Sequence, residues 1–247
     1  MASYCLKLIE KIEEASGTSS YKFERPNGFE YKAGQCVVIK VPAPQGSLPF
    51  SVRTFTLSSA PSEREYIQVT MRDGVSSFKK YLQRVKVGDR VEVFSPSGRY
   101  VVSENKKVPL VMLAGGIGIA PFRSMIVELM NQSNLNDILL IYSNPSIDRV
   151  TFKNELDFFQ KTLSSVVNKQ GFRLNVVYTL TKEVPGGWGG EIGRLDIEMI
   201  KKYVNDVHRP VYYICGPPQM VSEISDTLCD SLNVDKEKVK CEKFSGY

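Results

Sequence analysis

A glycine-rich segment in the middle of the chain has the residue types that accept a phosphate. It comprises Gly115, Gly116, Gly118 and Pro121, and it follows the apolar run Val108–Ala114. Glycines let the backbone turn tightly and let a phosphate approach the amide groups, while a helix N-terminus adds partial positive charge. The pattern favours a pyrophosphate site, although Pro121 replaces the third glycine of Gly-x-Gly-x-x-Gly. A turn that merely packs a strand on a helix is the alternative.

A second cluster, Ile214–Met220, follows another apolar run and contains Cys215, Gly216, Pro217 and Met220. If both runs are strands of one parallel sheet, both clusters lie at its carboxyl edge, where open α/β sheets bind ligands. Cys215 is small and polarisable, as suits the lining of a nicotinamide pocket. Taken alone, the cluster is better explained by a buried structural cysteine followed by a turn.

Several kinds of chemistry are excluded by composition. The chain has one histidine, His208, and five widely spaced cysteines with no Cys-x-x-Cys pair. A histidine-rich metal site, a disulfide framework and the four-cysteine spacing of a plant-type iron–sulfur cluster are therefore not expected. We predict no metal site.

Charge and hydropathy indicate an ordinary globular protein. The 247 residues carry a formal net charge of +5, with 42% hydrophobic and 24% charged residues. The basic residues are scattered, so no nucleic-acid partner is predicted. No apolar run approaches the roughly 20 residues that span a bilayer, and the N-terminus lacks the pattern of a signal peptide. We expect no transmembrane segment and a cytoplasmic location.

The two halves of the chain differ in periodicity, which predicts two domains, 1–104 and 105–247. The first half contains short β-branched or alternating runs separated by turn residues, which predicts a β-barrel or a β-sandwich. The second half alternates apolar runs with helical stripes, which predicts a doubly wound α/β fold with five parallel strands. The expected strands are 35–41, 55–57, 66–71, 90–94, 108–114, 138–142, 174–180, 211–214 and 239–244, with helices near 77–82, from Pro121, around Phe152–Phe159, at 196–204 and around Val221–Leu228.

Taken in order, the motifs of both halves resemble those of the ferredoxin–NADP reductase superfamily. Arg53-Thr54-Phe55-Thr56 is similar to its Arg-x-Tyr/Phe-Ser/Thr flavin motif, and Gly74-Val75-Ser76-Ser77 to its Gly-x-x-Ser pyrophosphate segment. The stretch from Gly88-Asp89 to Pro96-Ser97-Gly98 resembles its barrel-closing segment. The two glycine clusters above resemble its nicotinamide motifs, and Glu242-Lys243-Phe244 its Glu-x-aromatic ending.

The resemblance implies that the first half is an antiparallel β-barrel that binds FAD and that the α/β domain binds NAD(P)H. Arg53 would bind the FAD pyrophosphate, Phe55 would pack against the flavin ring, and Thr56 would lie near the flavin atom that accepts hydride. Catalytic roles are expected for Thr56, Cys215 and Glu242. The expected FAD residues are Arg53, Thr54, Phe55, Thr56, Thr70, Met71, Arg72, Gly74, Val75, Ser76, Ser77 and Phe244, and the expected nucleotide residues are Gly115, Gly116, Gly118, Pro121, Ser143, Asn144, Cys215, Gly216, Pro217 and Met220.

Two departures leave details open. Phe55 lacks the hydroxyl of the commoner tyrosine, and the tail continues past Phe244 to Tyr247, so either aromatic residue could cover the flavin; Phe244 is preferred. Ser143 with Arg149 or Lys153 would accept a 2′-phosphate, yet those basic residues are equally explained as a solvated helix face. The sequence does not choose between NADH and NADPH.

The predicted function is hydride transfer from NAD(P)H to FAD and electron transfer to a separate acceptor. By resemblance the acceptor is a ferredoxin, a flavodoxin or an oxygenase component. Reduction of free flavin or another small acceptor is the enzymatic alternative. Two alternatives belong to other classes of function: an FAD-binding electron-transfer subunit of a larger complex, and a purely structural α/β protein.

Overall fold

The structure, a computed structural model, describes residues 2–42, 50–102, 108–132, 137–165 and 173–244. Contacts divide the chain into two compact units. The first contains Met1–Val102 together with Ala120–Asn131, and the second contains Ser103–Ile119 and Gln132–Gly246. The division at 104/105 drawn from periodicity stays a prediction; the contacts add that residues 120–131 pack with the first unit.

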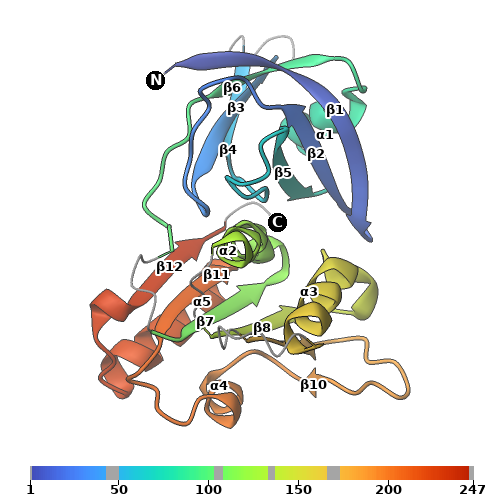
Figure 1. Ribbon diagram of the computed structural model, residues 1–247. Helices are drawn as coiled ribbons and strands as arrows, with labels where there is room; N and C mark the ends of the chain where they lie inside the picture. The colour runs from blue at the N-terminus through green and yellow to red at the C-terminus, as the bar shows by residue number, and fades with distance from the viewer. Residues whose placement is uncertain (1, 43–49, 103–107, 133–136, 166–172, 245–247) are drawn as a thin grey trace. The chain divides into compact units, whose positions relative to one another are not determined.

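The first unit is built on a six-stranded antiparallel sheet with the strand order β4-β3-β6-β1-β2-β5 (Figure 1). The sheet curls into a barrel-like shape because its two edge strands meet just beyond the end of β4. There Leu57 forms an antiparallel bridge with Val69, and the Ser58 N–H donates to the Gln68 carbonyl at 2.8 Å. The elements are β1 (Ser3–Ala15), β2 (Thr18–Glu24), β3 (Cys36–Pro42), β4 (Phe50–Thr56), β5 (Tyr66–Arg72), α1 (Ser77–Arg84) and β6 (Arg90–Phe94).

The strands alternate inward and outward side chains, as a barrel with one buried face requires. On β3, the inward side chains are at most 1% exposed, namely those of Val37, Ile39 and Val41. The residues between them are partly exposed. These side chains join a single apolar core that also contains Tyr21 and Phe23. The antiparallel β-barrel expected from the sequence is confirmed. The sequence reasoning did not single out β1 and β2, which are two of the six strands of this sheet.

The second unit is a parallel sheet with the order β10-β9-β8-β7-β11-β12. Every described pairing in it is parallel. The central strand β7 is buried along its whole length, which explains its unbroken apolar sequence. Its strands are β7 (Leu110–Gly115), β8 (Ile138–Asn144), β9 (Leu174–Leu180), β10 (Glu191–Ile192), β11 (Val211–Gly216) and β12 (Val239–Lys243).

The expected α/β doubly wound sheet is likewise confirmed, with one strand more than the five predicted. The additional strand, β10, has two residues and pairs with the end of β9. It is too short for a periodic signal and follows the glycine-rich loop 185–190. The helices are α2 (Ile119–Asn131), α3 (Lys153–Ser165), α4 (Ile197–Tyr203) and α5 (Pro218–Asp226). No helix in the described ranges is long and apolar enough to cross a membrane.

Candidate functional site

Arg53 and Phe55 lie on one face of β4, because residues two apart in a strand point to the same side. Both gather against the Phe78 ring of α1. The Arg53 guanidinium carbon is 5.9 Å from the centroid of that ring, and the Phe55 and Phe78 centroids are 5.6 Å apart. Phe55 is half-buried against the barrel core while Arg53 is exposed. The predicted flavin motif therefore presents a cation and an aromatic face at the edge of the barrel.

The segment Gly74–Ser77 leads into α1 and is exposed or half-exposed throughout, with Val75 at 86%. Ser76 caps the helix by accepting the Lys79 N–H at 3.3 Å. The first turn contains no acidic residue, so its amide groups and partial positive charge remain suited to an anion. These features fit the pyrophosphate of a dinucleotide.

Lys79 adds a second cation at this segment, which the sequence reasoning missed. Its chain lies over Gly74, where an added Cβ would come within 2.8 Å of the Lys79 Cδ. Burial lowers the pKa of Lys79, Asp73 acts in the opposite direction, and Arg72 reinforces the lowering. A lysine three residues into a short helix carries no sequence signal of its own, which is why only the fold identifies it.

The remaining FAD candidates are placed differently. The Thr70 hydroxyl is buried and hydrogen-bonded to the Ser20 and Ser58 hydroxyls at 2.7 and 2.8 Å. Met71 belongs to the barrel core, and Thr56 is 5% exposed at the end of β4. Thr54 is exposed and points away from the Arg53 face, and the Arg72 guanidinium lies 3.4 Å from the Thr18 hydroxyl. The structure thus brings Arg53 and Phe55 against Phe78, the residue that follows the Gly74–Ser77 segment, whereas the side chains of Thr70 and Met71 lie in the barrel interior.

In the second unit, the two glycine clusters interlock backbone to backbone. A Cβ on Gly118 would lie 2.2 Å from the Cys215 carbonyl oxygen, and one on Gly115 would lie 2.7 Å from the Pro217 Cδ. Gly116 has φ +53° and Gly216 has φ +155°, in the region that favours glycine. Close packing of the two loops is therefore enough to explain these glycines. They also leave the bare, tightly turned backbone that a pyrophosphate needs.

The strand register places the other nucleotide candidates beside these loops. Cys215 of β11 is paired with Ala114 on one side and with Glu242 on the other, and Gly115 is paired with Ser143 of β8. The sheet thus aligns the candidates from four neighbouring strands at one carboxyl edge. Asn144 is buried at the end of β8, whereas Pro217 and Met220 belong to the second loop and the start of α5.

The chain's last described residues continue this edge. The Phe244 N–H donates to the Gly216 carbonyl at 2.9 Å, so β12 stays bonded to the second glycine cluster to its end. Tyr247, the alternative flavin-covering residue, lies outside the described residues.

The helix after the first cluster begins at Ile119, two residues before the predicted start at Pro121. Pro121 still falls in the first turn, where the missing N–H leaves no intrahelical hydrogen bond unmade.

Cys215 is fully buried. Burial raises the pKa of its thiol well above the ordinary value, and Glu242 and Cys241 raise it further. A neutral, buried thiol is a poor nucleophile. Its side chain is therefore suited to shaping the sheet edge and not to covalent catalysis.

Lys153, a candidate for a 2′-phosphate, is engaged elsewhere. Its ammonium group pairs with Asp157 at 2.5 Å and lies 5.0 Å from the centroid of the Tyr178 ring. Asp148, the first acidic residue after β8, accepts a hydrogen bond from Ser146 at 2.5 Å. Arg149 is exposed. These contacts leave the choice between NADH and NADPH open.

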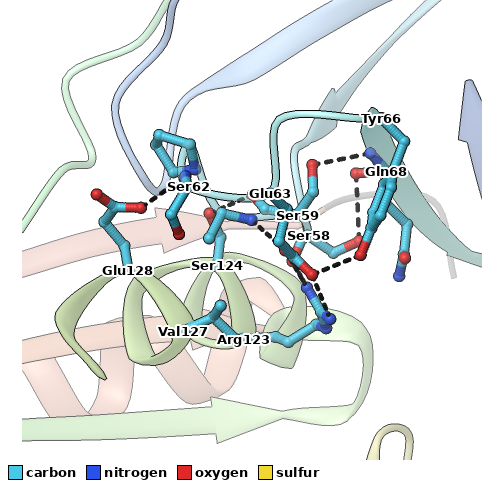
Figure 2. Close-up of polar contacts among 12 residues, drawn as sticks. Ser58, Ser59, Ser62, Glu63, Tyr66, Gln68, Arg123, Ser124, Val127 and Glu128 are labelled. Atoms are coloured by element: carbon cyan, nitrogen blue, oxygen red, sulfur yellow. Dashed lines mark hydrogen bonds and ion pairs between the residues drawn. The ribbon is translucent and has the colours of Figure 1, made fainter. Parts of the chain in front are cut away.

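A buried ion pair that the sequence reasoning missed lies in the first unit, between α2 and the loop after β4 (Figure 2). The Arg123 guanidinium donates to both oxygens of Glu63, at 2.8 and 3.0 Å, and to the Ser58 carbonyl at 2.8 Å. Glu63 also accepts the Ala60 N–H at 2.6 Å and the Tyr66 hydroxyl at 2.5 Å. The side chains of Arg123 and Glu63 are 7% and 19% exposed. Only the tertiary structure brings these residues together, so no local sequence signal could have revealed the pair.

The donors around Glu63 control its protonation. Burial by itself would raise the pKa of the carboxyl group, but Arg123, Tyr66 and the Ala60 N–H together outweigh burial and hold the pKa below its usual 4.5. Burial, and then the Glu63 carboxylate, raise the pKa of Tyr66, so its hydroxyl stays protonated as a donor. The cluster is fully hydrogen-bonded at neutral pH.

Comparison with known proteins finds similarity to proteins described as oxidoreductases. Residues 112–226, just under half of the chain, match the family described as the oxidoreductase NAD-binding domain. Flavohemoprotein A of Dictyostelium discoideum is 28% identical over 95% of this chain and 58% of its own length. NADH-cytochrome b5 reductase 1 of Meyerozyma guilliermondii is 28% identical over 87% of this chain and 74% of its own length. The chain thus spans little more than half of the flavohemoproteins that it matches.

Solved structures share the whole two-domain fold. The flavohem-like FAD/NAD-binding domain of nitric oxide dioxygenase from Vibrio cholerae has a TM-score of 0.82 at 22% identity, with 98% of both chains covered. A ferredoxin NADP⁺ reductase from Neisseria gonorrhoeae, solved with FAD and NADP, has a TM-score of 0.79 at 18% identity, with 98% of this chain and 99% of that chain covered. The resemblance expected from the motifs is confirmed at the level of fold.

Replacing Gly118 by alanine is expected to lower the free energy of unfolding by about 1–3 kcal/mol, because the new Cβ collides with the rigid backbone at Cys215. Thermal or urea unfolding measures the change. Gly189→Ala is the matched control, since a Cβ there meets nothing within 4 Å. Equal stability of the two variants would contradict the interlocked loops.

Glu63→Gln is expected to change how stability depends on acid. Because the folded-state pKa of Glu63 is lowered, its contribution is present above the unfolded pKa, near 4.5, and is lost as pH falls through the folded value. The wild type should therefore lose stability more steeply than the variant below about pH 4.5. Chemical unfolding at several pH values measures this difference, and parallel acid profiles would contradict it.

Proposed function

Because this chain has the two-domain fold of the ferredoxin–NADP reductase superfamily and carries an oxidoreductase NAD-binding domain, we propose that it is a flavoenzyme. It binds FAD and NAD(P)H and passes electrons from NAD(P)H through the flavin to a separate acceptor. The observation that carries the proposal is the occurrence of two distinct phosphate cradles in one chain. One is the exposed start of α1 with Arg53 beside it, and the other is the glycine loop after β7.

The first cradle is proposed to hold FAD. Arg53 offers a fork of donors with a permanent positive charge, and the Gly74–Ser77 amides add the helix N-terminus. Lys79 contributes a further cation at the same segment. Phe55 offers a half-buried aromatic face for the flavin ring. Thr56, at the end of the same strand, is proposed to hydrogen-bond near the reactive edge of the flavin.

The second cradle is proposed to hold the nicotinamide nucleotide. The Gly115, Gly116 and Gly118 backbone would approach the pyrophosphate, and Ser143 and Asn144 end the neighbouring strand toward the ribose. Cys215 and Glu242, adjacent in the register, are proposed to shape the nicotinamide end. Cys215 does so as a buried, neutral side chain at the end of β11, and Glu242 as a polar group.

When bound, the flavin supplies the redox chemistry by accepting a hydride and releasing electrons singly or in pairs. The residues of this chain bind the two cofactors, orient them and exclude water. Orientation alone accounts for a large part of such rates, because it converts an encounter between two cofactors into a reaction within one complex.

The acceptor is proposed to be a separate redox protein. The names of the matched proteins point to a carrier of this kind, since they include NADH-cytochrome b5 reductases and ferredoxin reductases. The chain itself has no cysteine spacing for an iron–sulfur cluster of its own.

The proposal predicts that the purified protein is yellow and that NADH or NADPH bleaches its flavin band without oxygen. Anaerobic titration with each nucleotide in turn, followed by absorbance, measures both the reaction and the nucleotide preference. A flavin band that stays oxidised with both nucleotides, or a protein that takes up no FAD, would refute the proposed function.

Arg53→Met is expected to weaken FAD binding roughly tenfold to a hundredfold, since a hydrogen bond to a charged group contributes about 1.5–3 kcal/mol. Flavin released on gel filtration, or an FAD titration of the apoprotein, measures the loss. Arg90→Met is the control, because Arg90 is also an exposed barrel arginine but pairs with Glu24 on the β1–β6 side. Equal flavin retention by both variants would remove Arg53 from the site.

A further inference from the structure

We propose that Arg123 and Glu63 are positioning residues, which hold α2 in the register that nucleotide binding requires. With them act Ser124, Glu128 and Asn131 of α2 and the loop Ser58–Glu63; together these residues are called the α2 anchor. This inference rests on the proposed function, because it assigns a task to the helix that follows the nucleotide loop.

The anchor residues occupy one face of α2. At 100° per residue, positions 123, 124, 128 and 131 fall within about 140° of one another, whereas the buried apolar positions 122, 125, 126 and 129 fall on the opposite side. Helix packing alone needs only the apolar face. The second, polar face therefore has a separate purpose.

Every anchor side chain of α2 bonds to the same loop, and Figure 2 shows the contacts of Arg123, Ser124 and Glu128. Arg123 bonds to Ser58 and Glu63, and the Ser124 hydroxyl donates to the Ser59 carbonyl at 2.6 Å. Further along the helix, Glu128 accepts the Ser62 N–H at 2.9 Å, and the Asn131 amide donates to the Ser62 hydroxyl at 3.0 Å. Hydrogen bonds have a defined direction and length. Bonds from successive turns thus fix both the position of the helix along its axis and its rotation about that axis. An apolar surface restricts these two movements less strictly.

The two ends of the anchor lead to the two proposed cradles along the chain. The loop Ser58–Glu63 continues β4, and only Leu57 separates Thr56 from Ser58. At the other end, α2 starts at Ile119, directly after Gly118. Arg123 lies in the second turn, so any rotation or slide of α2 is passed on to the glycine loop. The position of the helix start determines where its amide groups point toward a pyrophosphate.

Stability alone does not account for a buried ion pair. Replacing such a pair by apolar residues of similar volume is often neutral or stabilising, whereas removing one partner is costly because the other charge is left buried. The same asymmetry separates a positioning role from a structural one in an experiment.

The test is the double variant Arg123→Met/Glu63→Met, compared with Arg123→Met alone. The single variant leaves Glu63 buried without its cation and should unfold at a lower temperature. The double variant should recover the part of that loss that the unpaired charge causes and keep its flavin, while the Ala60 N–H, the Tyr66 hydroxyl and the Ser58 carbonyl each lose a partner. Its dissociation constant for NAD(P)H, measured by anaerobic titration, and its KM should nevertheless rise about tenfold, since even a 1 Å misplacement can cost up to about a hundredfold.

The control is the double variant Arg90→Met/Glu24→Met, which removes an ion pair of two half-exposed side chains and should change neither affinity nor KM. Wild-type nucleotide affinity in the stable anchor double variant would overturn the inference. If that variant does not fold, Arg123→Lys decides. Lysine keeps the charge but loses the two-pronged geometry, so a KM raised at least threefold supports positioning, and an unchanged KM overturns it.

The failure of this inference is distinguishable from failure of the proposed function. If neither nucleotide reduces the flavin of the wild type, the proposed function itself is wrong. If the wild type is reduced normally and the anchor double variant has the same affinity and KM, only the positioning role is wrong.

Discussion

The second unit depends on how closely two backbone turns approach each other. Gly118 lies against the Cys215 carbonyl with no room for a single carbon atom between them, and a Cβ on Gly115 would also collide, at 2.7 Å from Pro217 and Met220. This approach brings the ends of β7 and β11 together and aligns Ala114, Cys215 and Glu242 across three strands. The glycines are thus required by packing before any ligand is considered. A ligand would use a surface that the fold has already made free of side chains.

Much of the fold was predictable from the sequence because each half has its own hydrophobic period. The buried strand β7 is an unbroken apolar run, and the helices that follow show stripes of period 3.6. The β1 and β2 strands were missed because they are rich in charged and small polar residues. On β1 the buried Leu6 and Leu8 alternate with exposed neighbours, but the three residues after Leu8 are all exposed and break the alternation. Serines and threonine open β2. Their pairing partners, not their own composition, make them strands.

The candidate site was predictable to the extent that its residues are adjacent in the sequence. Arg53 with Phe55, and the glycines of each cluster, are local motifs with a physical reason for their spacing. Thr70 shows the limit of such reasoning. It lies just before the Gly74–Ser77 segment in the sequence, but in the barrel its hydroxyl bonds to Ser20 and Ser58. Arg123 shows the opposite failure, since its partner Glu63 is sixty residues away. Which buried charges meet is decided by the tertiary fold.

The assignment of residues 120–131 to the first unit means that the order of the chain and the grouping of contacts disagree. Helix α2 is encoded between β7 and β8 of the parallel sheet, yet its polar face is completed by the loop after β4. A fragment that ends near residue 104 would leave the Glu63 carboxylate without its cation and Ser59 without its donor. The barrel and the loop after β4 are therefore not a module that a single cut near that boundary excises intact, because the polar cluster around Glu63 is completed by residues of α2 that lie beyond it.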